Sequence, residues 1–174
     1  MMWLWLLFGS ILFGGFMVFT GAPYLPSKRR DIRQAFTELY PLGPTDVLVD
    51  IGAGDGIVLR VARQCGAKVI GYEINPLLVL VARLLSRHDS ATTVVLANFW
   101  YATLPADTTV VYTFGESRDI KKMYAYVQKQ ATAIGRPLAF ISYGFAVPGE
   151  HPTKQVGASF LYTVKPLQEL DTPL

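Results

Sequence analysis

The residues best suited to chemistry are three glycines, Gly52, Gly54 and Gly56, which stand among two carboxylates, Asp50 and Asp55. Glycines at this density let a chain turn sharply and let its backbone approach a ligand closely. The spacing Gly-x-Gly-x-Gly differs from the dinucleotide fingerprint Gly-x-Gly-x-x-Gly, and two carboxylates would repel a pyrophosphate. They suit a ligand that carries an ammonium group, such as the methionine end of S-adenosylmethionine (SAM).

A further carboxylate, Glu73, follows the loop by roughly twenty residues, at the expected end of the next strand. A carboxylate at this place accepts hydrogen bonds from the hydroxyls of an unmodified ribose. The alternative is that Glu73 only caps the helix that begins at Pro76 and that the loop is only a tight turn. The joint occurrence of loop and acid at the right elements favours a nucleoside site.

These residues must be positioned by alternating strands and helices. Short apolar runs predict strands, and amphipathic stretches between them predict helices. The expected strands are 46–50, 68–73, 93–96, 110–113, 138–143 and a closing 159–164 that could run antiparallel; the expected helices are 57–65, 76–87 and 118–133. This alternation predicts an α/β fold with a doubly wound, mostly parallel, Rossmann-like sheet.

The N-terminal segment differs in character from the rest. Residues 2–20 carry no charge, and as a helix they would reach roughly 28 Å, close to the hydrocarbon thickness of a bilayer. Trp3 and Trp5 suit one membrane interface, and the basic run 28–30 favours the cytoplasmic side at the other end. A cleaved signal peptide is the alternative, but it would require a positive start and a shorter apolar core.

The chain is therefore expected to divide into a transmembrane anchor (1–21), a connector with an N-terminal helix (22–45) and a catalytic domain (46–174). In the second part, Ser27 is the expected N-cap of an amphipathic helix that runs to about Tyr40. The domain would face the cytoplasm, or an organelle membrane would hold the chain if its source is a eukaryote.

Composition excludes several other classes. A net charge of +3 without a basic stripe argues against a nucleic-acid partner. One cysteine, Cys65, excludes an intrachain disulfide framework and provides no metal-ligand spacing, so no metal is expected.

The run 50–56 matches the acid-x-Gly-x-Gly-x-Gly motif of the class I SAM-dependent methyltransferases. Three segments, 22–27, 46–56 and 142–145 with Pro148-Gly149, resemble the small membrane-anchored protein-lysine methyltransferases. In mitochondria, members of that family modify the ATP synthase c subunit and the adenine nucleotide translocase, and they have prokaryotic relatives. The resemblance covers nearly the whole chain, and the glycine motif is its specific part.

This resemblance implies a set of SAM-binding residues. Asn98 and Phe99 would frame the adenine, and the segment around Tyr24 would lie over the active site. The family usually has Asp where Asn98 stands; Asn98 keeps a carbonyl acceptor but loses a charge, which predicts weaker cofactor binding. The residues that would hold the rest of SAM are Asp50, Gly52, Ala53, Gly54, Asp55, Gly56 and Glu73.

Methyl transfer to lysine requires a neutral amine in line with the sulfonium methyl group, and aromatic walls can hold the amine and its methylated product. Tyr24, Trp100 and Tyr143 are the candidates for these walls, although aromatic residues at strand ends often only fill the core. Glu116 could orient the amine, or it could cap a helix beside Ser117.

Three functions remain open at this point. The first is methylation of lysine in a membrane-associated protein, which the short chain favours because an open site can be completed by a protein segment. The second is methylation of a membrane-resident small molecule, such as a lipid or quinone. The third is a SAM-binding module without catalysis. An NAD-dependent enzyme is disfavoured by the loop carboxylates and the glycine spacing.

Overall fold

The computed structural model describes residues 3, 5, 28–115 and 117–167. The expected anchor and the connector up to Ser27 lie outside the described residues, apart from Trp3 and Trp5. Among the described residues, no helix has both the length and the apolar character needed to cross a bilayer.

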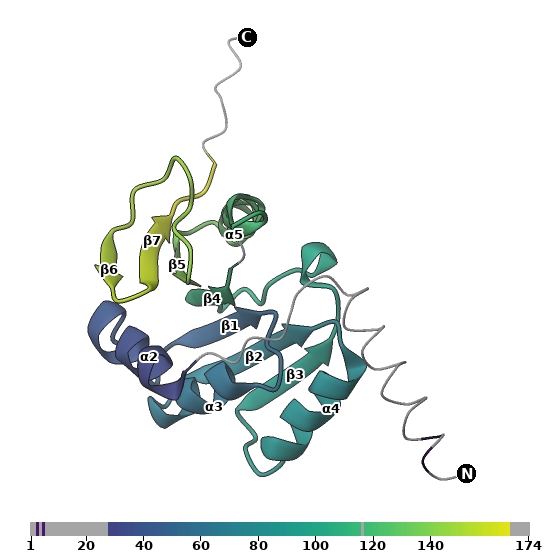
Figure 1. The fold of residues 1–174 in the computed structure, drawn as a ribbon. Helices are drawn as coiled ribbons and strands as arrows, with labels where there is room; N and C mark the ends of the chain where they lie inside the picture. Colours follow the sequence, from purple (N-terminus) through teal and green to yellow (C-terminus); the bar gives the residue numbers. More distant parts are fainter. Residues whose placement is uncertain (1–2, 4, 6–27, 116, 168–174) are drawn as a thin grey trace.

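Seven strands form one sheet in the order β3-β2-β1-β4-β5-β7-β6 (Figure 1). The first five strands are parallel, and β7 runs antiparallel to β5 and to β6. Because the order reverses beside β1, the carboxyl ends of β1 and β4 flank the switch point where such sheets bind ligands. The strands are β1 (Val47–Ile51), β2 (Lys68–Glu73), β3 (Thr92–Leu96), β4 (Val110–Phe114), β5 (Leu138–Tyr143), β6 (Lys154–Val156) and β7 (Ser159–Val164).

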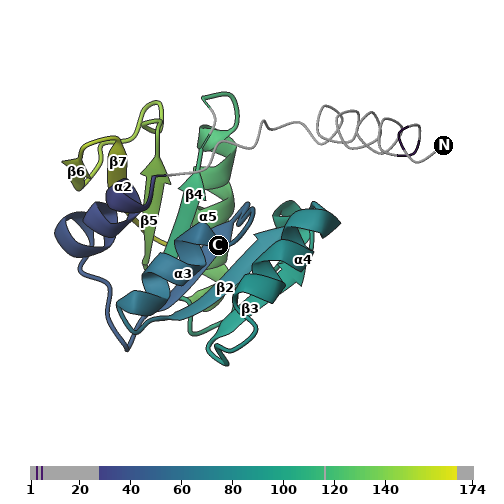
Figure 2. The same cartoon turned by 60° about the horizontal axis from the view of Figure 1, so that its bottom comes forward.

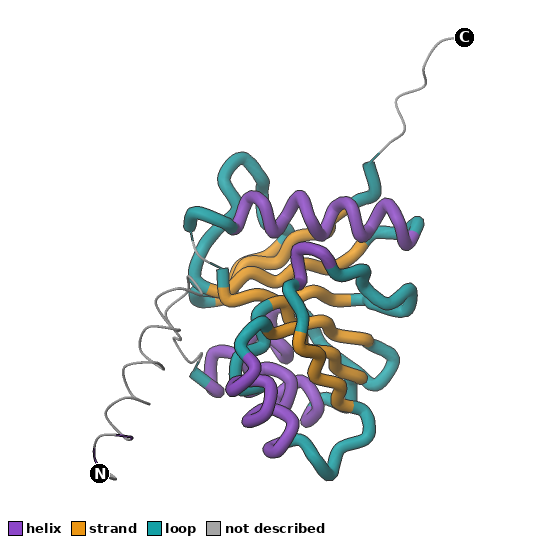
Figure 3. The backbone as a smooth tube through the Cα atoms, turned by 90° about the vertical axis from the view of Figure 1, so that its right-hand side faces the viewer, coloured by secondary structure: helices purple, strands orange, loops and turns teal. Residues whose placement is uncertain are grey.

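Helices cover both faces of the sheet (Figures 2 and 3). One face packs against α2 (Arg29–Gln34), the π-helical turn η1 (Ala35–Leu39), α3 (Ile57–Gln64) and α4 (Pro76–Leu85). The opposite face packs against α5 (Ile120–Ile134). Neighbouring strand residues point to opposite faces, so strands buried on both sides read as continuous apolar runs.

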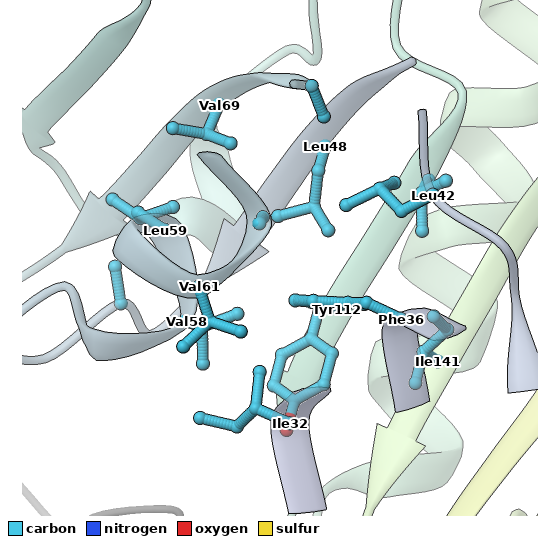
Figure 4. Packing of buried hydrophobic residues seen from close by; sticks show 14 of the residues in the cluster. Ile32, Phe36, Leu42, Leu48, Val58, Leu59, Val61, Val69, Tyr112 and Ile141 are labelled. Atoms are coloured by element: carbon cyan, nitrogen blue, oxygen red, sulfur yellow. The ribbon is translucent and has the colours of Figure 1, made fainter. Parts of the chain in front are cut away.

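The core on the α2–α3 face is built from aliphatic side chains around one aromatic pair (Figure 4). Phe36 of η1 and Tyr112 of β4 contact each other edge to face, with ring centroids 5.8 Å apart. Ile32 and Ile141 pack in the same cluster. The N-terminal helix is thus fixed on the sheet by aromatic and aliphatic burial.

The opposite face has less helical cover. Between β3 and β4, where every residue is described, the chain forms only a 3-10 turn, η2 (Phe99–Tyr101), in place of a crossover α-helix. Tyr126 of α5 reaches across and donates a hydrogen bond to the Ala102 carbonyl at 3.2 Å. The aromatic residues of η2 therefore sit directly between the end of β3 and α5.

The α/β sheet is confirmed, and three details of the expectation are wrong. The first helix has Lys28 as its N-cap, without a side-chain cap, and the expected cap, Ser27, lies outside the described residues. The last turn of that helix is π-helical and not α-helical, closed by a hydrogen bond from Tyr40 N–H to the Ala35 carbonyl at 2.9 Å. The first strand begins at Val47, one residue later than expected, and the Asp46 carboxylate accepts a hydrogen bond from the Tyr40 hydroxyl. The edge strand β6 was not expected, since three residues give too short a pattern.

Candidate active site at the carboxyl edge of the sheet

The glycine loop joins β1 to α3 at the carboxyl edge of the sheet. Gly52, Gly54 and Gly56 all have positive φ angles, of 93°, 54° and 79°. A side chain at these angles would be strained, so the loop needs glycine at each position. Gly52 and Ala53 donate their backbone N–H groups to the Tyr72 carbonyl of β2 at 2.9 and 3.0 Å, which holds the loop over the end of that strand.

Glu73 fixes the same loop from the neighbouring strand. Its Oε2 accepts a hydrogen bond from Gly54 N–H, and its Oε1 accepts one from Asn75 N–H, both at 2.8 Å. The side chain is 8% exposed. Each carboxylate oxygen keeps a further lone pair, so Glu73 can still accept hydrogen bonds from ribose hydroxyls.

Asp50 is the unusual group of the site. It lies on β1 with 2% of its surface exposed, and its Oδ2 atom has no hydrogen-bond partner among the described residues. Burial, followed by the charges of Glu73 and Asp55, raises the pKa of the Asp50 carboxyl well above its usual range. A buried carboxylate without a partner is costly, and a cationic group beside it would relieve that cost.

Asp55 makes contacts within the loop and to the start of α3. Its Oδ2 forms an ion pair with Arg60 Nη2 at 3.1 Å, and its Oδ1 accepts a hydrogen bond from Ile57 N–H at the start of α3. Arg60 also donates to the Asp55 carbonyl at 2.6 Å. The side chain thus closes the loop onto α3, and of the two flanking acids only Asp50 has an oxygen without a hydrogen-bond partner among the described residues.

Gly71 is a residue of the site that the sequence reasoning missed. A Cβ at Gly71, in the middle of β2, would lie 2.7 Å from both Ala53 Cβ and Leu59 Cδ1. Glycine here lets the loop and α3 pack directly on the strand. The available signal was a glycine inside an apolar strand pattern, which marks a close approach of another segment.

The turn after β3 groups aromatic side chains. The Phe99 and Trp100 ring centroids are 4.4 Å apart, and both rings meet the edge of Tyr126. Asn98 Oδ1 accepts a hydrogen bond from Trp100 N–H at 3.1 Å, so the carbonyl expected to face adenine is already used once, to shape the turn. Its side-chain amide and a second lone pair remain. Tyr126 is an addition that only the fold brings to this group.

Tyr143 ends β5, across β4 from the glycine loop. Its hydroxyl donates to Asp31 Oδ2 of α2 at 2.7 Å, and its ring lies 5.4 Å from that of Phe114. The hydrogen bond to Asp31, with burial, raises the pKa of the Tyr143 hydroxyl. The other two residues expected to act on the substrate, Tyr24 and Glu116, lie outside the described residues.

The structure therefore gathers the expected residues into two groups on one edge. Asp50, Glu73 and the glycine loop follow β1 and β2, with Asn98 and Phe99 after β3 on the same side. Tyr143 follows β5 on the other side of β4. In the part of the chain that the structure describes, no cluster of acidic, histidine or cysteine side chains could hold a metal ion.

No protein-family model matches the chain. Among curated proteins it is similar to the adenine nucleotide translocase lysine N-methyltransferase of Mus musculus, with 40% identity over 63 residues, 36% of this chain and 27% of that protein. It is also similar to the lysine N-methyltransferase of the ATP synthase c subunit from Xenopus laevis, with 26% identity over 120 residues, 67% of this chain and 52% of that protein. The matches thus span about half or less of these relatives.

The fold is shared with solved methyltransferases. An RNA methyltransferase from Salinibacter ruber, in complex with S-adenosyl-L-homocysteine, superposes with a TM-score of 0.73 and 25% identity over 84% of this chain and 98% of that one. A geranyl diphosphate methyltransferase in complex with SAM gives a TM-score of 0.53 at 18% identity, over 66% of this chain and 48% of that one. The chain therefore has the fold of the class I SAM-dependent methyltransferases, and its sequence resembles the protein-lysine methyltransferases of the ATP synthase c subunit and the adenine nucleotide translocase.

Proposed function

We propose that this chain is a membrane-anchored, SAM-dependent methyltransferase that modifies lysine in a membrane-associated protein. The observation that carries the proposal is the Oδ2 atom of Asp50, which has no hydrogen-bond partner in the described part of the chain and lies beside a glycine loop that Glu73 fixes. Such an atom fits a cationic ligand, and SAM carries an ammonium group.

The other residues at this edge fit the rest of that molecule. Glu73 would accept hydrogen bonds from the ribose hydroxyls, and Asn98 and Phe99 would contact adenine. When bound, SAM supplies a methyl group on a sulfonium centre that an amine can attack. The two solved methyltransferases described above hold SAM or its demethylated product, which supports this choice of cofactor.

The chain's contribution to transfer is positioning and desolvation. Trp100 and Tyr143 would line the approach of the lysine, where an apolar wall lowers the pKa of an amine and favours its neutral form. Tyr143 acts here as a neutral phenol, because its raised pKa keeps the proton on its hydroxyl group. That hydroxyl donates a hydrogen bond to Asp31. Proton removal is therefore assigned to water or to the substrate protein.

Lysine and the membrane are supported by separate observations. The curated relatives are named as lysine N-methyltransferases. The uncharged run 2–20 has the length of a bilayer span, and the basic run that follows favours a cytoplasmic domain, or an organelle membrane in a eukaryote. An anchor would raise the effective concentration of a target in the same membrane.

The test is to incubate the purified full chain with methyl-labelled SAM and membranes from its own host, and then to locate the label by peptide mass analysis. Label on a lysine of a membrane protein is expected, and Glu73→Ala should abolish it. The matched control is Glu38→Ala, which changes an exposed glutamate on η1 and should leave the label unchanged.

The other outcomes separate the alternatives. Label in the lipid fraction would establish a small-molecule substrate. Label in RNA would favour the activity for which the Salinibacter ruber protein is named, against the expectation from the low net charge. SAM binding without label in any fraction would favour a non-catalytic binding module.

A further inference from the structure

Helix α4 presents an apolar surface to solvent. Leu80 is 64% exposed and Leu84 56% exposed, whereas the fully buried side chains of the helix are the smaller Val79 and Ala82. We define the α4 face as the exposed apolar residues of the helix and the residue before Asn75: Ile74, Leu77, Leu80, Val81, Leu84 and Leu85.

This arrangement differs from that of an ordinary surface helix, because α4 is apolar on its exposed side as well as on its buried side. A helix at the edge of a soluble domain normally turns its apolar stripe inward and its polar residues outward. In α4 the exposed positions recur three or four residues apart and are aliphatic, so they form one stripe along the helix. A contiguous exposed stripe of this kind marks a surface that contacts another apolar phase or partner.

The charges around the stripe indicate which partner. From Ile74 to His88 the sequence contains no acid and two arginines, Arg83 and Arg87; the first acid that follows, Asp89, is paired with Arg63 at 2.7 Å. Arg83 donates from Nε and Nη2 to the Val94 carbonyl, at 2.9 and 2.8 Å, which fixes its charge beside the helix.

A second copy of the chain fits these charges poorly. In a two-fold pairing the same patch meets itself, so arginines would face arginines with no acid in the stripe to pair with them. A lipid surface with anionic headgroups offers both an apolar interior for the leucines and negative charge for the arginines.

We propose that the α4 face lies on a bilayer that contains anionic lipids, as a second membrane contact of the domain. This inference rests on the proposed function only through the membrane anchor and is independent of methyl transfer. Helix α4 begins one residue after Asn75, whose N–H is bound by Glu73. Docking would therefore hold the cofactor-binding edge of the sheet at the membrane surface.

The test uses the full chain with Cys65→Ser, so that one new cysteine carries an environment-sensitive nitrobenzoxadiazole label. Leu84→Cys reports on the α4 face, and Ala125→Cys, an exposed position on α5, is the matched control. Each protein is mixed with phosphatidylcholine–phosphatidylserine vesicles whose lipids carry a nitroxide quencher, and co-flotation is measured in parallel.

We expect the label at position 84 to lose most of its emission and the label at 125 to keep it. Leu80→Gln should lower the docked population about tenfold, because it removes one apolar side chain from the contact. Leu167→Gln, the same change at an exposed leucine outside α4, should have no effect. Omission of phosphatidylserine should weaken the quenching at position 84.

Three results would overturn the proposal. Co-flotation without quenching at position 84 would mean that the anchor holds the chain while α4 stays in water, which leaves the proposed function intact. A blue-shifted label at position 84 in the absence of vesicles would mean that protein covers this face. Failure to co-float would remove both the α4 contact and the anchor.

Discussion

Asp50 and Glu73 are buried acids on neighbouring strands, but they differ in the hydrogen bonds that they accept. Both oxygens of Glu73 accept backbone N–H groups, while Asp50 keeps an oxygen without a partner among the described residues. Glu73 is therefore stable without a ligand, and Asp50 is stabilised by one. At a site of this kind the free protein is less stable, and its affinity for the ligand is higher.

Replacement of Asp50 should separate its effect on the stability of the free protein from its effect on SAM affinity. We expect Asp50→Asn to raise the free energy of unfolding of the ligand-free protein at neutral pH by about 1–3 kcal/mol, because it removes a buried carboxyl group whose ionisation the fold disfavours. The same change should weaken SAM binding at least about tenfold, through loss of a charge-assisted hydrogen bond. Urea unfolding and titration calorimetry measure the two effects.

The pH dependence of that comparison has a defined sign. The folded-state pKa of Asp50 is raised, so the ligand-free wild type loses stability as pH rises from the unfolded value of about 4 through the folded value. The gap between Asp50→Asn and wild type should therefore close in acid. Equal stabilities across the whole range would show that the carboxylate has a partner.

The sequence predicted which residues form the site better than it predicted which groups those residues contact. The motif 50–56 and Glu73 follow from spacing and from their positions at strand ends. The Asp55–Arg60 pair depends on the loop geometry at the start of α3, and Tyr126 reaches η2 only because β4 and α5 bring it there. The contact of Tyr126 joins distant segments, which leaves no local sequence pattern that could predict it.

Among the elements, the packing of helix α3 on strand β2 depends on a glycine, which has no side chain, at position 71. Gly71→Ala would place a Cβ 2.7 Å from Ala53 and Leu59, and we expect a loss of about 1–3 kcal/mol of stability together with weaker SAM binding, since Ala53 belongs to the loop. Thermal unfolding and calorimetry test this. Gly43→Ala, where a Cβ would meet only Asp46 Oδ2 at 4.0 Å, should be close to neutral.

A second pair of elements is joined by charge. Arg63 of α3 donates to Asp89, ahead of β3, at 2.7 Å, and this hydrogen bond lowers the pKa of Asp89. The pair should stabilise the fold by about 1 kcal/mol at neutral pH, a partial value because both side chains are partly exposed. Urea unfolding of Asp89→Asn measures this loss.

Since the pKa is lowered, this contribution is complete above the unfolded value of about 4 and disappears as pH falls through the folded value. Asp107→Asn is the matched control, because its pairing with Lys68 is half exposed on both sides and should contribute almost nothing. A similar loss in both variants would argue against the assigned role of Asp89.

Most of the helices and strands could be predicted from the sequence. β2, β5 and β7 begin and end where the apolar runs do. For β2 and β5 the reason is that parallel strands buried on both faces give continuous patterns. The π-helical turn and β6 were not readable. The turn depends on how Phe36 and Leu39 reach the core, and β6 is fixed by pairing with β7 rather than by its own residues.

For the whole molecule, the anchor and the domain should be separable. The two cores of the described residues are built from positions 32–164, and we expect deletion of 2–20 to leave SAM affinity unchanged. Methylation of a membrane target should fall sharply, because the effective concentration is lost. Calorimetry and the labelling assay test the two parts. Loss of folding would instead make the segment part of the domain.

The hydrogen bond between Tyr143 and Asp31 bears on which lysines of a membrane protein the active site can reach. It places the start of α2 at the same edge of the sheet as the glycine loop. If residue 20 marks the membrane surface, the eight residues 21–28 can extend at most about 26–29 Å. With the α4 face released from the bilayer, as expected for Leu80→Gln, the connector would set how far above the bilayer a lysine can lie and still be modified. A longer connector should then shift modification to residues farther from the membrane.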